Sequence, residues 1–235
     1  DYPAFISMEQ PLTYRQVNDI SSDLAGYLQS LGSLKPGDRV AIMMPNLLQY
    51  VIAMYACLRA GYIVVNINPL YTSREVNGTL RDSEAKAIII IENFAKTLQN
   101  ALPGTKCEHI ITTAVGDLFP FFKRTLVNFV VRKVKKMVPE YSLPNAVGFN
   151  EALEIGRRHG FTAHEIHNTD IAFLQYTGGT TGLSKGAVLT HRNIVAATLQ
   201  ADAWFTPALS KVGDLSKANS IAALPLYHIF ALTLC

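Results

Sequence analysis

The chain contains 235 residues, of which 49% are hydrophobic and 17% charged, and its net charge is +3. This length and apolar content exclude a disordered protein and supply material for a sizeable core. The three cysteines, Cys57, Cys107 and Cys235, form no C-x-x-C pair, so we expect neither a disulfide framework nor a thiolate zinc site, as in a reducing cytosol. No apolar run reaches the roughly 18 residues of a membrane-spanning helix, and no signal peptide is recognisable.

The first hundred residues predict helices that alternate with short apolar strands. Thr13 and Gln16 form a capping box, and the helix that follows has one apolar face and ends at Gly32. Nearly all-apolar strands that alternate with helices are typical of an α/β fold with parallel strands covered on both faces. Beyond the first helix, we expect strands from residue 39, over 62–66 and over 86–91, and helices over 47–60 and 73–82.

The segment 117–150 has a different character. Its central stretch, residues 122–138, carries a charge of +6, which leaves −3 for the rest of the chain, and the valines of that stretch share one face of a helical wheel. The charge is local, so we do not expect nucleic-acid binding. Two interpretations stay open for residues 119–138: a helix packed on its own domain with a solvated charged face, or a basic amphipathic helix lying on an anionic membrane. The cations are Lys123, Arg124, Arg132, Lys133, Lys135 and Lys136, the valines are Val127, Val130, Val131, Val134 and Val138, and Phe119, Phe121 and Phe122 add apolar surface.

A glycine- and threonine-rich loop, TGGTTGLSKG over residues 177–186, follows the strand-like run DIAFLQYT and precedes the β-like AVLT and a helix from Thr190. Small residues allow backbone N–H groups to converge on an anion, while hydroxyls and Lys185 add donors and positive charge. Polyphosphate is therefore the expected ligand. The Walker A motif does not match, because it requires a glycine immediately before the lysine and Ser184 precedes Lys185 here. The dinucleotide fingerprint G-x-G-x-x-G does not match either, because the first two glycines of the loop are adjacent.

Other interpretations of the loop and its surroundings are a serine hydrolase, an exposed linker and a metal site. Ser184 lies in a G-x-S-x-G pattern, with Asp202 or Asp214 and then His228 further along, which is the chain order of a serine hydrolase. Against this, five loop residues follow the strand, and a β-like run replaces the helix that a nucleophile elbow needs. An exposed linker would rarely place lysine and paired threonines between apolar strands. For the histidines of RRHGFTAHEIHN, a solvated connector is a better account than a metal site; they are His159, His164 and His167.

The stretch YTGGTTGLSKGAVLTHRN resembles the phosphate-binding signature of the adenylate-forming, acyl-activating enzymes. The stretches LTYRQV, GDRVAIMMPN, LRAGYIVVNINPLYTSREV and ALPLYHIFAL resemble the same family in order and spacing, so the likeness covers nearly all of the chain except the basic segment. The variants YTGGTTG and LPLYHIFAL look most like bacterial long-chain fatty-acid CoA ligases. The basic segment also resembles that group, which works at the inner face of the cell membrane.

This resemblance implies ATP-dependent activation of a long-chain fatty acid through an acyl-adenylate to acyl-CoA, with ATP, Mg²⁺ and CoA. It implies catalytic roles for Lys185, Thr177 and His228, with Thr177 as a Mg²⁺ ligand, and a fatty-acid site at Tyr227, His228 and Phe230. Activation of a medium-chain or aryl acid is the alternative within the superfamily, and a homodimer is compatible with the resemblance. The implied nucleotide-binding residues are Tyr176, Thr177, Gly178, Gly179, Thr180, Thr181, Gly182, Ser184, Lys185 and Gly186.

The expected domain organisation is that of an incomplete N-terminal AMP-binding domain. A first α/β part spans 1–116, the basic connector 117–150, and the phosphate-loop part with the start of the acyl-site segment 151–235. Asp1 is no initiator methionine and Cys235 falls within the apolar run IFALTLC, so we expect an internal fragment that is inactive alone. The C-terminal domain, with the family's later motifs, is expected outside it. A non-enzymatic membrane-binding fragment is a further hypothesis.

Overall fold

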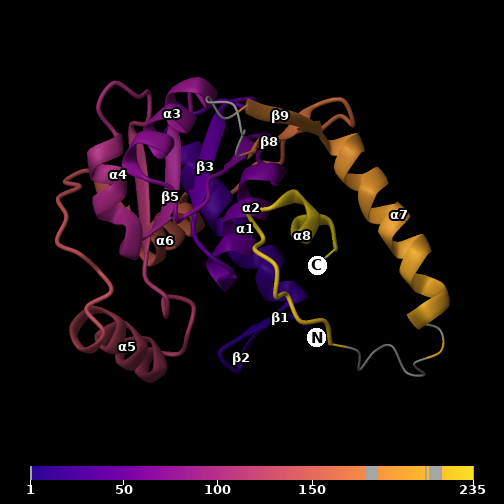
Figure 1. Cartoon of the computed structure of the whole chain (residues 1–235), viewed down its shortest axis with the longest axis horizontal. Coiled ribbons are helices and arrows are strands. Elements are labelled where there is room, and N and C mark those ends of the chain that lie inside the picture. Colours follow the sequence, from indigo (N-terminus) through magenta and orange to yellow (C-terminus); the bar gives the residue numbers. More distant parts are fainter. Residues whose placement is uncertain (1, 178–184, 210, 212–218, 235) are drawn as a thin grey trace.

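The computed structural model of the chain describes residues 2–177, 185–209, 211 and 219–234. Its centre is a seven-stranded sheet in the order β7-β6-β5-β3-β4-β8-β9 (Figure 1). Neighbouring strands from β7 to β8 are parallel, and β9 is antiparallel to β8. A separate hairpin of β1 (Pro3–Ser7) and β2 (Gln10–Thr13) precedes the sheet. The sheet strands are β3 (Arg39–Met43), β4 (Ile63–Asn66), β5 (Ala87–Ile91), β6 (His109–Thr113), β7 (Ala146–Gly148), β8 (Ile171–Thr177) and β9 (Lys185–Thr190).

Helices cover both faces of this sheet. In β5, Ile89 packs into the core formed with α1, α2 and α6, whereas Ile88 and Ile90 pack into the core formed with α3 and α4. Side chains of a strand alternate between faces, so an all-apolar strand needs cover on both sides. The helices are α1 (Tyr14–Ser30), α2 (Leu48–Arg59), α3 (Ser73–Ser83), α4 (Ala95–Ala101), α5 (Phe121–Phe129), α6 (Phe149–His159), α7 (His191–Leu209) and α8 (Ile229–Leu234), with a 3₁₀ turn over Glu92–Phe94.

The structure confirms the α/β class and the predicted elements of the first hundred residues. Thr13 caps α1 by accepting a hydrogen bond from Gln16 N, while the Gln16 side chain accepts one from Thr13 N. Gly32, just after the helix, has a φ of +66°, which favours glycine. A second capping box, between Thr72 and Glu75, starts α3.

The sheet is parallel except at β9, which pairs with β8 in the antiparallel direction. Only seven residues separate β8 from β9, and a parallel crossover needs a dozen or more, so the chain turns back as a hairpin. The side chains of β9 are largely exposed or half-buried, which also departs from full cover on both faces.

The basic segment forms a shorter helix than its pattern predicts. After α5 the chain makes a π-helical turn over Val130–Val134, and Lys136 adopts a φ of +49°, which ends the helix before Val138. The wider π turn rotates the side chains relative to an ideal wheel. Val127 therefore packs against the core while Val134 is exposed, so the valines do not form one shared face. Among the described residues, no helix is long and apolar enough to cross a membrane.

Candidate nucleotide and acyl site

The β8–β9 hairpin brings the two ends of the glycine- and threonine-rich loop together. Thr177 pairs with Lys185, and Tyr176 pairs with Gly186. Lys185 is exposed and forms no ion pair within the described ranges, so its charge is available to a phosphate at the loop. The predicted residues Gly178, Gly179, Thr180, Thr181, Gly182 and Ser184 lie outside the described residues, and their roles stay predictions.

Tyr176 supports the base of this hairpin from the α3 side. Its hydroxyl donates a hydrogen bond of 2.5 Å to Asp82 Oδ2, and its ring lies against Gly186, where an added Cβ would be 3.0 Å from Cζ. Burial and this carboxylate contact raise the pKa of Tyr176 well above its ordinary value, so the phenol stays protonated and donates. Glycine at 186 therefore leaves room for the ring that closes one side of the hairpin.

The segment 222–228, which contains the LPLYH motif, lies over the carboxyl end of the sheet. Its backbone is held by a side chain that follows β3: Asn46 Nδ2 donates to the carbonyl oxygens of Ala222 and Leu224, and Asn46 Oδ1 accepts from Leu226 N. The Leu226 side chain is buried in the core shared with α2. One amide thus anchors backbone groups of three alternate residues of the segment.

A buried polar network joins the same segment to the middle strands. The Tyr50 hydroxyl lies 2.9 Å from both Asn66 Oδ1 and the Leu226 carbonyl oxygen. Asn66 Nδ2 donates to Gln175 Oε1 over 3.2 Å, and Gln175 Nε2 donates to the Tyr227 carbonyl oxygen over 2.8 Å. Since Asn66 and Gln175 pair in register on β4 and β8, the network bridges two strand ends.

These strand ends are where α/β proteins bind ligands. The connection that leaves β4 returns past β3 to β5, while the one that leaves β8 goes outward to β9, so the chain diverges between β4 and β8. Ligands of open α/β sheets bind in the crevice beyond the carboxyl ends at such a divergence. The phosphate-loop hairpin and the LPLYH segment meet at this point.

Two predicted acyl-site residues, Tyr227 and His228, end this anchored segment, and the third, Phe230, follows it. Tyr227 is half-buried, and its ring centroid lies 4.8 Å from that of His228. His228 N donates to the Pro225 carbonyl oxygen in a turn that leads into α8. His228 and Phe230 are both exposed, so within the described residues they wall no tunnel, and their predicted contact with a fatty acid stays a prediction.

Sequence reasoning did not single out Asn46, Tyr50, Asn66 and Gln175. A usable signal was present for two of them, because Asn66 and Gln175 are polar residues near the ends of otherwise apolar strands, in the runs IVVN and IAFLQYT. A buried amide at such a position needs a hydrogen-bond partner, which predicts a polar neighbour at the strand end.

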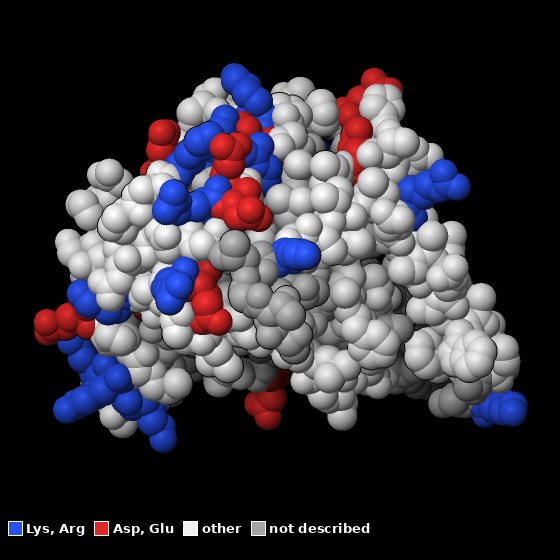
Figure 2. Space-filling view, turned by 45° about the horizontal axis from the view of Figure 1, so that its top comes forward, with Lys and Arg blue, Asp and Glu red and all other residues white. Residues whose placement is uncertain are grey.

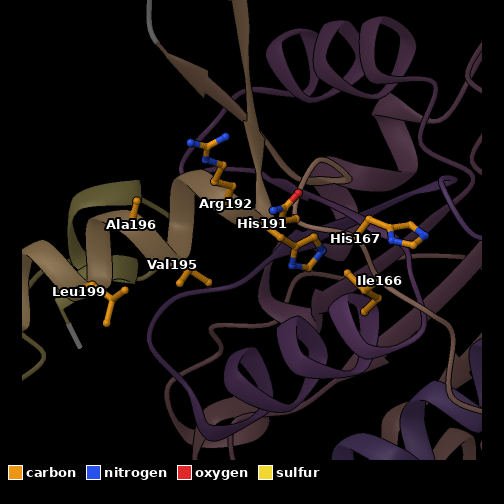
Figure 3. Close-up of a pocket in the computed structure, with 8 residues that line it drawn as sticks. Ile166, His167, His191, Arg192, Val195, Ala196 and Leu199 are labelled. Carbon is orange, nitrogen blue, oxygen red and sulfur yellow. The ribbon is translucent and has the colours of Figure 1, made fainter.

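A pocket of about 420 Å³ lies at the other end of the β8–β9 hairpin. The pair Ile171–Thr190 lies next to this pocket, six residues before Thr177 on β8 and five after Lys185 on β9, or about 20 Å along the strands. Burial lowers the pKa of His191, despite the nearby Asp170 carboxylate. In Figure 3 the Arg192 side chain extends to the opposite side of α7 from Val195 and Leu199. The lining residues are Ile166, His167, Asn168, His191, Arg192, Val195, Ala196 and Leu199.

The serine-hydrolase and metal interpretations find no geometric support in the described residues. A strand begins directly after Ser184, where a nucleophile elbow has a helix, and β8 ends five residues before Gly182. The ring of His164 packs against Gly61. Within the ranges that the structure describes, no group of three or more histidine, cysteine or acidic side chains is placed to hold a metal ion. The Mg²⁺ role of Thr177 stays a prediction.

Comparison with known proteins adds independent information. The profile of the AMP-binding enzyme family matches residues 1–235. The chain is 54% identical over 99% of its length to a long-chain-fatty-acid–CoA ligase of Haemophilus influenzae, and 51% identical over 100% to one of Escherichia coli O157:H7. It spans 41% of the length of each of these relatives. A crystal structure of a long-chain-fatty-acid–CoA ligase from Archaeoglobus fulgidus superposes on the whole chain, and on 40% of that protein, with a TM-score of 0.68 and 24% identity, which supports the fold.

Proposed function

Because the chain belongs to the AMP-binding enzyme family, we propose that the protein that contains it activates a long-chain fatty acid with ATP and transfers the acyl group to CoA. The observation that carries this proposal is the Gln175–Tyr227 hydrogen bond, which places the phosphate-loop hairpin beside the LPLYH segment. A nucleotide site and an acyl site must adjoin if a carboxylate is to reach the α-phosphate. Relatives at 51–54% identity bear the name of this activity.

The proposed reaction has two displacements. A carboxylate oxygen of the fatty acid forms a bond to the α-phosphorus of ATP, and diphosphate leaves with the electron pair of the broken P–O bond. The CoA sulfur, after loss of its proton, then forms a bond to the acyl carbon, and AMP leaves. Most of the first step is positioning and charge neutralisation.

In this proposal the hairpin serves the first displacement. Lys185 is the first residue of β9, where its exposed ammonium can neutralise the charge that builds up on departing diphosphate. A Mg²⁺ ion, when bound, would neutralise phosphate charge in the same way, with Thr177 as its candidate ligand. Tyr176 and Asp82 hold the base of this hairpin in place.

Peripheral contact with the cytoplasmic face of an anionic membrane is part of the proposal. It is supported by exposed apolar side chains around α5, of which Phe122 is 85% exposed. Bulky apolar residues beside cations are the composition that binds the boundary between headgroups and acyl chains. The exposed set is Phe121, Phe122, Leu126, Phe129, Val134 and Met137.

The cations of this surface are only partly available to lipid. Arg132 is bound to Glu92, and Lys123 Nζ donates to the Met8 carbonyl oxygen, so neither side chain is free. Lys133, Lys135 and Lys136 are exposed and form no ion pair within the described residues. Figure 2 shows a group of Lys and Arg side chains at lower left, where Figure 1 places α5. The proposed membrane surface therefore combines the phenylalanines with the last three lysines.

Exchange of radioactive diphosphate into ATP tests the activity. The full-length protein is supplied with acids of different chain length and with an aryl acid, and acyl-CoA is then measured after CoA is added. We expect exchange to depend on a long-chain acid. Exchange that depends on the aryl or medium-chain acid instead would assign another substrate, and no exchange with any acid would overturn the proposal.

A further inference from the structure

Side chains hold the backbone of the LPLYH segment, whereas a β-strand is held by backbone hydrogen bonds to a neighbouring strand. Five of its backbone groups have a partner from only three side chains: Asn46, Tyr50 and Gln175. Asn46 and Tyr50 come from the β3–α2 part of the chain, whereas Gln175 lies on β8. The position of the segment therefore depends on two parts of the fold at once.

Only one orientation of the Asn66 and Gln175 amides satisfies all hydrogen bonds of this network. Gln175 must donate its amide nitrogen to the Tyr227 carbonyl oxygen, which cannot donate, so Oε1 of Gln175 faces Asn66 Nδ2. The amide oxygen of Asn66 then faces the Tyr50 hydroxyl. That hydroxyl has one proton for two acceptors at 2.9 Å, Asn66 Oδ1 and the Leu226 carbonyl oxygen. Rotation of either amide by 180° would bring two acceptors face to face.

This network is shielded from water. Tyr50 is fully buried, and Asn66 and Gln175 are buried as well. Burial raises the pKa of Tyr50 far above its ordinary value, so its hydroxyl remains a donor. If the Gln175 amide were lost, water could not readily replace it, and the Tyr227 carbonyl would have to move to find another donor.

We propose that Gln175 is a positioning residue that sets the fatty-acid site relative to the nucleotide loop. It lies two residues before Thr177 on β8, and its amide fixes the carbonyl between Tyr227 and His228. This carbonyl lies within the turn from Pro225 to His228, which also carries the rings of Tyr227 and His228. Fixing the carbonyl therefore fixes the position of both rings. This inference rests on the proposed ligase function and adds to it the residue that aligns the two substrates.

Gln49 provides a matched control. It too is a buried glutamine whose Nε2 donates to a backbone carbonyl, that of Ala114, over 2.9 Å. That carbonyl follows β6, away from the LPLYH segment. Gln175→Met and Gln49→Met therefore remove the same kind of hydrogen bond with the same change of shape, and only the first removes a contact to the proposed acyl site.

The test compares KM for fatty acid, KM for ATP and kcat in the full-length protein and both variants. We expect Gln175→Met to raise the KM for fatty acid at least about fivefold over Gln49→Met, with the KM for ATP changed less than about twofold. Tyr50→Phe, which keeps the ring and removes the shared proton, should shift the same KM in the same direction.

Equal KM values for fatty acid in the two glutamine variants would overturn the positioning role. Failure of both Gln175→Met and Tyr50→Phe to give folded protein would also overturn it, because the network would then serve stability alone. An unmodified protein without fatty-acid-dependent exchange would instead overturn the proposed function, so the two failures are distinguishable.

Discussion

Gly156 of α6 lies directly against the backbone of Asp23 in α1: a Cβ at position 156 would be 1.8 Å from the Asp23 carbonyl oxygen and 2.5 Å from Tyr27 N. Both atoms belong to the backbone and cannot rotate away. Gly156→Ala should therefore push the helices apart and lower the free energy of unfolding by about 3 kcal/mol. Urea denaturation followed by circular dichroism measures this change.

Gly78 of α3 is the control for that substitution. It lies in an exposed position of the helix, and an added Cβ would meet no heavy atom of the described residues within 4 Å. Gly78→Ala should raise the free energy of unfolding by about 0.5–1 kcal/mol, because alanine loses less backbone entropy in a helix. Similar effects of the two substitutions would show that helix propensity, and not the close approach of α1 and α6, determines the outcome.

The Arg132–Glu92 pair should anchor the basic segment to the end of β5. The Glu92 carboxylate is buried and accepts three hydrogen bonds from the half-exposed guanidinium, which also raises the pKa of Arg132. Arg132→Met would leave this carboxylate without its charged partner and should cost about 2 kcal/mol of unfolding free energy. Lys133→Met, which removes a neighbouring charge that has no ion pair in the described part of the chain, should cost less than about 0.5 kcal/mol. Equal losses would argue against the anchor.

Lys185 should matter for ATP more than for the fatty acid. Lys185→Ala in the full-length protein should lower kcat/KM for ATP by about 100-fold or more, as expected for loss of a charge that stabilises a transition state. Fatty-acid affinity, measured by displacement of a fluorescent acid, should change little. The control is Lys211→Ala, which removes an exposed cation beyond the end of α7. Unchanged ATP dependence of Lys185→Ala would contradict the role assigned to this residue.

The phenylalanines of α5 should carry much of the membrane affinity. The double variant Phe121→Ser and Phe122→Ser should bind vesicles that contain phosphatidylglycerol about tenfold more weakly. A phenylalanine ring that is fully buried in the membrane contributes about 1.5–3 kcal/mol to binding, and a partly buried ring contributes less. Leu70→Ser, at a position 77% exposed and outside this surface, should leave binding unchanged. Vesicle flotation at two salt concentrations measures both the apolar and the charged contribution. Equal flotation of all three proteins would exclude this surface.

Local signals were sufficient to predict most elements of the first hundred residues. The capping box at Thr13, the glycine at position 32 and the apolar runs placed helices and strands within one or two residues of their observed bounds. These signals act over a few neighbouring residues, so no knowledge of the tertiary structure is needed. The short strands β6 and β7 offered weaker patterns and were not predicted.

Long-range relationships were beyond the sequence pattern. The contact of Gln175 with Tyr227 joins residues 52 positions apart, and nothing local to either residue specifies it. Likewise, the prediction that the valines of the basic segment share one face assumed an ideal α-helix. In the structure, the π turn and the Arg132–Glu92 pair determine which side chains face the domain. The exposed apolar surface of that segment therefore consists mainly of phenylalanines, with Val134 as its one exposed valine.

The pairing of β8 with β4 has a consequence for the order of folding. Asn66 and Gln175 are 109 residues apart, so β8 can join the sheet only after a long loop has closed, whereas β3, β4 and β5 associate through short crossovers. Closing a long loop is slower because it costs more chain entropy. The contacts that offset this cost can form only when β4, the strand that β8 pairs with, is already in place. The end of the molecule proposed to hold ATP and the fatty acid should thus be the last to become ordered. In a chain emerging from the ribosome, a stable α/β core would precede any capacity to bind substrate.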